Sequence, residues 1–248
     1  MGTSSSRNAP KGGDWTKAKR SVSNYVRQRG RGGVTPRNLI GNFVRALGGA
    51  REAVSGTGRA GGKSTFFPAV SVGQKLGAFL VGVAKDGLDQ TFSKWGLADL
   101  IGKNPYEVVS HLVDALAGAG GPLDEAVARA ALTETLANIF DENNEEYIQL
   151  REDWDSRINE VEILEILKIF LIEVIYRRFL SDLAERIQSK AISSDDAFER
   201  ESEIRGFIEE MIKFTLVIHD PLNIDWRGAE GRDLITQNME AVLAQAEV

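Results

Sequence analysis

The chain has 248 residues, enough for one substantial core, and its 42% hydrophobic and 27% charged residues are typical of a soluble folded protein. It contains no cysteine, which excludes disulfide bonds, thiolate nucleophiles and cysteine-ligated zinc and fits a cytoplasmic location. The net charge of −6 is the sum of a basic amino-terminal part and an acidic remainder. Residues 1–75 carry 14 Lys and Arg against two acids, whereas the remaining residues carry 16 against 34. This asymmetry predicts two parts with different roles.

The first predicted part, residues 1–65, is a basic tail with short helices. It holds 13 of the 25 glycines and is rich in Ser, Arg and Lys. Such a segment is expected to be flexible, because it buries too little apolar surface to offset the entropy lost on ordering. We expect a mobile tail to about Ala18 and then one or two short basic helices with flexible glycine joints. Apolar residues at helical spacing from Leu39 to Leu47, followed by Gly48-Gly49, mark the clearest of these helices.

The stretch GTGRAGGKST, residues 56–65, resembles a phosphate-binding loop but fails its spacing. The pattern Gly-x-x-x-x-Gly-Lys-Ser/Thr requires a glycine where this chain has Thr57. The residues before the stretch have a helical pattern instead of a strand pattern, and FFPAV follows where a helix should open. We therefore predict a flexible basic linker here and no ATP site.

The second predicted part, residues 66–248, is an acidic α-helical domain. Apolar residues recur at helical spacing over residues 70–87, 104–118, 121–140, 158–190, 196–220 and 231–248. The stretch 158–190 is apolar on most sides, which is typical of a helix at the centre of a bundle, and its interspersed charges argue against a membrane span. No strand pattern stands out. The predicted fold is therefore all-α, an irregular multi-helix bundle with a flexible basic Gly-rich N-terminal segment.

Residues suited to catalysis or metal binding are few. His111 lies three residues before Asp114 but lacks the further ligands that a metal site needs. His219 lies just before Asp220-Pro221, which interrupts the helical pattern. No Ser-His-Asp arrangement or nucleophile elbow is present, and the acidic runs are expected to be solvated. We predict that the chain has no catalytic residue, metal or cofactor and is not an enzyme.

The amino-terminal residues leave several functions open. Methionine is readily removed before a small residue, which would leave Gly2 with a free amine and no side chain to clash in a narrow enzyme pocket. The same letters match the N-myristoylation pattern, with Ser6 in the required place. The basic residues between 7 and 63, with Trp15 and Tyr25 as stacking groups, would suit a nucleic-acid-binding adaptor. They would equally suit docking on an acidic surface, of the body or of a partner.

Several residues resemble a known family. The start MGTSSS, the Gly/Arg-rich lead and the body over residues 97–132 are similar to the B component of the bacterial Qat anti-phage defence system, the QatB family. The specific matches in the body are the Gly-Leu-x-x-Leu-x-Gly piece at residues 96–102 and Gly120-Gly121 ahead of Asp124 and Ala126.

The resemblance implies a non-enzymatic role. It implies three operon companions, namely an ATPase, a TatD-like nuclease and a QueC-like enzyme that handles deazapurine carboxylates with ATP. Gly2 would be the acceptor of a deazapurine group, presented by the tail while the helical body docks on the QueC-like partner. The tail residues expected to contact that partner are Thr3, Ser4, Ser5, Ser6, Arg7, Lys11 and Trp15.

Overall fold

The protein is all-helical in a computed structural model that describes residues 11–28, 32–56, 64–139 and 146–247. These residues form eleven α-helices, two short 3₁₀ helices and no strand, which confirms the predicted fold class. In chain order the elements are α1 Gly13–Gln28, α2 Pro36–Ala46, α3 Ala50–Ser55, α4 Phe67–Asp86, α5 Leu88–Lys94, η1 Ala98–Leu100, α6 Pro105–Ala117, α7 Leu123–Ile139, α8 Tyr147–Arg157, α9 Glu160–Lys190, α10 Ser194–Thr215, η2 Pro221–Asn223 and α11 Ala229–Glu247.

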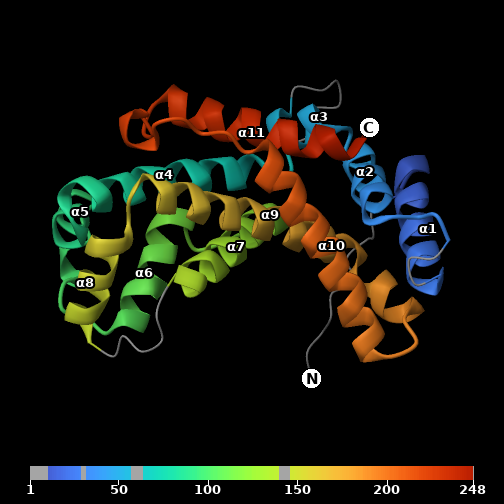
Figure 1. Cartoon of the computed structure of the whole chain (residues 1–248), viewed down its shortest axis with the longest axis horizontal. Helices are drawn as coiled ribbons and strands as arrows, with labels where there is room; N and C mark the ends of the chain where they lie inside the picture. The colour runs from blue at the N-terminus through green and yellow to red at the C-terminus, as the bar shows by residue number, and fades with distance from the viewer. Residues whose placement is uncertain (1–10, 29–31, 57–63, 140–145, 248) are drawn as a thin grey trace.

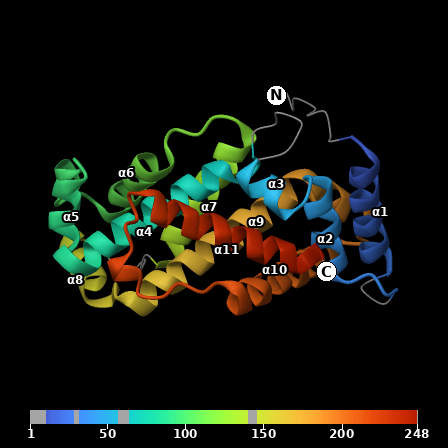
Figure 2. The same ribbon diagram turned by 90° about the horizontal axis from the view of Figure 1, so that it is seen from above.

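The long helix α9 is the centre of the bundle, as its apolar pattern predicted. It packs against α1, α4, α7 and α10, while α11 lies across α2, α3 and α4 (Figures 1 and 2). The first two helices stand at one end of the molecule, and α5, α6 and α8 stand at the other. The elongated bundle therefore places the amino-terminal helices far from the α5–α8 end.

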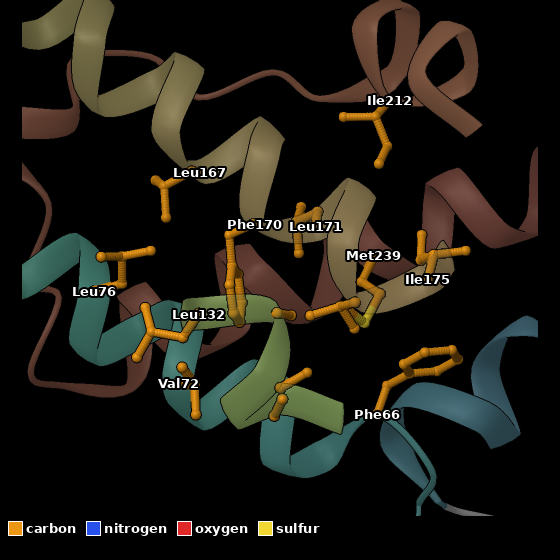
Figure 3. Packing of buried hydrophobic residues seen from close by; sticks show 14 of the residues in the cluster. Phe66, Val72, Leu76, Leu132, Leu167, Phe170, Leu171, Ile175, Ile212 and Met239 are labelled. Carbon is orange, nitrogen blue, oxygen red and sulfur yellow. The ribbon is translucent and has the colours of Figure 1, made fainter. Parts of the chain in front are cut away.

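The core is one continuous apolar cluster that draws on helices from both halves of the chain. Figure 3 shows its middle, where Leu76 of α4, Leu132 of α7, Phe170 of α9 and Met239 of α11 belong to the same cluster. Buried residues of the basic segment, such as Phe43, belong to the same cluster. Residues before and after position 65 are thus held together by shared burial of apolar surface.

Local signals account for several helix ends. The Asn104 side chain accepts a hydrogen bond from the Tyr106 N–H at 2.9 Å, Pro105 opens α6, and Gly118 ends it with φ of 74°. Thr35 caps α2 in the same way, and Asn38 accepts a bond from the Thr35 N–H at 2.8 Å to complete a capping box. These short-range patterns are readable in the sequence because they depend on neighbouring residues only.

The amino-terminal segment is more ordered than its composition predicted. The expected mobile tail to Ala18 is wrong for the described residues, because α1 begins at Gly13 and buries Ala18 completely. Gly48 and Gly49 end α2 as predicted, with φ of 101° and 95°, which only glycine adopts readily. Tertiary packing of a few apolar residues offsets the entropy cost that the glycine-rich composition suggested.

The interpretation of FFPAV was also wrong, because α4 begins at Phe67, with Pro68 in its first turn. The segment before the glycine-rich stretch is nevertheless helix α3, as its pattern predicted, so the strand that a phosphate-binding loop requires is absent from residues 32–56. Residues 57–63 lie outside the described residues. Within the described chain α4 is the one helix long and apolar enough to cross a membrane, and half of its apolar stretch is buried inside the bundle.

Candidate functional site at the first helix

The first helix carries the described end of the predicted tail and is fixed on the body through one apolar face. Val22, Tyr25 and Val26 recur at helical spacing on α1 and are each at most 2% exposed. They pack against α2 and α9, so the helix is docked on the centre of the bundle. The chain is therefore anchored from Gly13 onward.

An aromatic ladder strengthens this anchor. The half-buried ring of Trp15 meets Phe43 of α2 edge-on, with 6.0 Å between centroids. Phe43 in turn meets Phe179 of α9 edge-on at 5.4 Å. Edge-to-face pairs of this kind contribute about 0.5–1.5 kcal/mol beyond their buried area. Trp15 was predicted to contact a partner, and in the structure its ring contacts the protein's own core.

A polar contact holds the C-terminal half of α1 against α10. The Tyr25 hydroxyl donates a hydrogen bond to the Glu203 carboxylate of α10, and the Arg200 guanidinium holds that carboxylate at 2.7 Å. Burial, followed by the bond to Glu203, raises the pKa of Tyr25 above its usual range. Stacking of Tyr25 on a nucleic-acid base is therefore wrong as an interpretation, because the ring is already buried in the protein.

The remaining predicted tail residues divide into two groups. Lys11 is exposed, two residues before α1 begins. The acceptor Gly2 and the predicted contacts Thr3, Ser4, Ser5, Ser6 and Arg7 lie outside the described residues. The structure brings Lys11 and Trp15 to the same end of α1, and the contacts of all these residues with a partner stay predictions.

Charged side chains buried in the bundle are ion-paired. The fully buried carboxylate of Glu173 on α9 lies 2.9 Å from Arg177 Nε and 2.6 Å from Arg205 Nη1 of α10. Arg178, also on α9, lies 2.7 Å from the carboxylate of Asp182 and 3.2 Å from that of Asp124. These pairs join α7, α9 and α10. A structural role suffices for them, because each buried charge already has its counter-charge.

The two histidines are not part of any such cluster. His111 is exposed on α6 and His219 is exposed after α10, where Asp220 adopts a φ of 49°. Over the described ranges no group of three His, Asp or Glu side chains is placed to hold a metal ion.

An exposed apolar corner lies where α9 turns into α10. Ile192 and Phe198 are each 73% exposed there, beside a hollow of about 390 Å³ that they line with Ala197 and Glu201. Desolvation at this corner raises the pKa of Glu201. Phe198 lies on α10, the same helix as Glu203, which accepts a hydrogen bond from Tyr25 of α1. The apolar corner is therefore close to the place where α1 packs on the body. Exposed apolar surface of this kind is typical of a protein-binding site.

The sequence did not predict this corner or the Tyr25–Glu203 contact. Phe198 occupies an ordinary position in a helical pattern, and only the course of the neighbouring helices leaves it uncovered. Tyr25 and Glu203 are 178 residues apart, and nothing local links them. The helical spacing of Val22, Tyr25 and Val26, by contrast, is a visible signal for the buried face of α1.

The fold and the site define the structural class of the protein, which is an all-helical bundle with a basic first helix packed on an acidic body. The family model for "Qat anti-phage system associated protein QatB" matches residues 48–244. The chain therefore belongs to the QatB family and is a component of an anti-phage defence system. The match covers the body residues that carried the resemblance and begins after α2, so the start of the chain and α1 lie before it. No curated protein and no solved structure matches this chain at a significant level.

Proposed function

We propose that this protein is a non-enzymatic component of the Qat system that presents Gly2 to a QueC-like enzyme in the cytoplasm. Membership of the QatB family carries the proposal. The docking of α1 supports it, because a chain held at Gly13 gives the preceding residues a fixed point of departure. The ATPase and the TatD-like nuclease are proposed as further partners of the same system.

The reaction proposed for Gly2 requires only a neutral α-amino group as the nucleophile. An α-amino group has a pKa of about 7.7–8.0, so a useful fraction is neutral and nucleophilic near neutral pH. Its nitrogen would attack the carboxyl carbon of a deazapurine acid that the enzyme has activated with ATP. An amide bond would form, the activating group would leave with the carboxyl oxygen, and the amine would release a proton to solvent. The helical body would supply binding and orientation only.

The anchor limits where the partner's active site can lie. Eleven peptide units separate Gly2 from Gly13, and a fully extended chain of that length spans at most about 40 Å. A complex that presents Gly2 therefore places the enzyme's acyl site within that distance of the start of α1. The apolar corner at Ile192 and Phe198 is the proposed docking point, because it combines exposed apolar surface with proximity to α1.

Co-expression with the QueC-like partner tests the proposal. Intact mass of the wild-type protein should show the Gly2-started chain plus the deazapurine acid less one water. Gly2→Pro should abolish the addition, because proline replaces the slender primary amine with a bulky secondary one, whereas Thr3→Ala should retain it. Unmodified mass beside a demonstrably active partner would contradict the role of Gly2.

The same system tests the docking point. Phe198→Glu should weaken co-purification with the enzyme and slow modification at least tenfold. Phe214→Glu is the matched control, since Phe214 is equally exposed at 76% near the other end of α10. Equal behaviour of the two variants would place the docking surface elsewhere on the body without touching the assignment of Gly2.

A further inference from the structure

A basic groove lies between the first helix and the last turns of the central helix. Its volume is about 380 Å³, and five cations line it: Lys19, Arg20 and Arg27 from α1 with Arg186 and Lys190 from α9. No acidic side chain is among its lining residues. The basic groove is thus built by two helices that only the fold brings together.

Most of these cations lack an internal counter-charge. Arg20, Arg27, Arg186 and Lys190 have no ion-pair partner within the described part of the chain. The buried arginines elsewhere in the bundle are paired, as Arg178 is with Asp182 and Arg200 with Glu203. Like charges gathered on one hollow repel one another, and a bound anion would relieve that repulsion. The groove therefore favours a polyanionic ligand.

The other lining residues narrow the chemical class. Thr16, Ser23 and Asn24 complete the lining, which contains no apolar or aromatic side chain. A protein partner usually requires buried apolar or aromatic anchors, and single-stranded nucleic acid requires aromatic stacking platforms. Neither is available here. The Thr16 and Ser23 hydroxyls already donate to the carbonyls of Gly12 and Lys19, which leaves Asn24 and the four cations Arg20, Arg27, Arg186 and Lys190 to contact the ligand.

We propose that the basic groove binds the phosphate backbone of a nucleic-acid duplex without reading its sequence. Arginine side chains match phosphate geometry, and backbone contacts by Arg, Lys and Asn position a protein without base recognition. From Lys19 to Arg27 the helix rises about 12 Å, which corresponds to about three or four phosphates of one strand at about 3.4 Å each. The inference does not depend on Gly2, because α1 is anchored independently of the residues before it.

Binding of a random-sequence duplex to the full-length protein, followed by fluorescence anisotropy over a range of salt concentrations, tests the groove. Phosphate contacts by the four cations Arg20, Arg27, Arg186 and Lys190 predict that log K falls against log salt with a slope of about −3.6 for DNA. The variant Arg20→Gln/Arg186→Gln, which removes one exposed cation from each helix, should reduce the steepness by about 1.8 and weaken binding at least about tenfold at low salt.

The matched control is Arg37→Gln/Arg51→Gln. Both arginines are exposed and belong to the same basic segment, but neither lines the groove. This variant should bind more tightly than the groove variant, and equal loss in the two would overturn the assignment in favour of diffuse attraction. Duplex DNA and duplex RNA as separate probes show which backbone is preferred, and binding of either supports the proposal. Competition by polyglutamate as effective as by DNA at equal charge would overturn it.

Discussion

At the residue scale, buried polar side chains decide how the helices are joined. Tyr25 ties α1 to α10 through Glu203, and Glu173 ties α9 to α10 through Arg205. The sequence shows each of these residues as one polar letter in a helical pattern, with no sign of burial or partner. Asn104 and Gly118 were predictable because a cap acts on its own helix, whereas an ion pair between helices depends on where both helices run.

Tyr25 makes the stability of the protein sensitive to alkaline pH. Its pKa is raised in the folded state, chiefly by burial, so the folded protein keeps the phenol proton at a pH where the unfolded chain loses it. The resulting stabilisation is complete below about pH 10, the ordinary pKa of tyrosine, and is lost as the pH rises further. Urea unfolding between pH 8 and 11 should show a steeper alkaline loss for wild type than for Tyr25→Phe.

The other buried tyrosines do not obscure this comparison. Tyr147 and Tyr176 also have raised pKa values from burial, but both are present in the two proteins and cancel in the difference. Identical alkaline curves for wild type and Tyr25→Phe would show that the Tyr25–Glu203 contact does not persist in solution.

At the element scale, the closest approaches between segments depend on glycine. A Cβ at Gly41 of α2 would lie 2.2 Å from the carbonyl oxygen of Ala246 in α11, and one at Gly77 of α4 would lie 2.3 Å from the Trp226 ring. These glycines sit inside helical patterns, where their low helix propensity would otherwise count against them. The helices were predictable from the sequence. It could not indicate that Gly41 lets α2 cross α11 closely or that Gly77 lets α4 pack against the Trp226 ring.

Substitution at one of these crossings should therefore be costly. Gly41→Ala is expected to lower the free energy of unfolding by about 1–3 kcal/mol, because the backbone of α11 cannot move aside as a flexible side chain would. Gly206→Ala in α10 is the matched control: its Cβ would meet no atom within 4 Å, so it should raise the free energy of unfolding by about 0.5–1 kcal/mol. Urea midpoints measure both, and a stabilising Gly41→Ala would contradict the close crossing.

At the scale of the whole molecule, the basic and acidic parts share one core. Val22 and Phe43 from the basic segment belong to the same apolar cluster as Phe179 from the acidic part. The division at residue 65 is a division of charge, whereas the buried apolar core includes residues from both sides of it. Charge is a property of surface side chains, so a change in its sign along the chain need not coincide with an interruption of the core.

Two truncated chains distinguish the contribution of α1 to stability from that of the residues before it. A chain that starts at Gly12 should keep the unfolding temperature of wild type, because α1 and all its described core contacts remain. A chain that starts after Gln28 loses the buried residues Val22, Tyr25 and Val26, each worth about 1.5–3 kcal/mol of burial, and should lose at least about 3 kcal/mol of stability. Calorimetry of the three proteins checks this, and equal stability of all three would mean that α1 is not docked in solution.

The sequence by itself determined the helical class, the central place of residues 158–190 and several helix ends, because periodicity and capping act over a few neighbouring residues. Only the tertiary structure decided that α1 is docked on the body, that Trp15 and Tyr25 face inward, and that cations of α1 and α9 line one groove. These outcomes depend on contacts between different helices, and Tyr25 and Glu203, for example, are 178 residues apart. Burial in a shared core, which no local pattern encodes, brings such segments together.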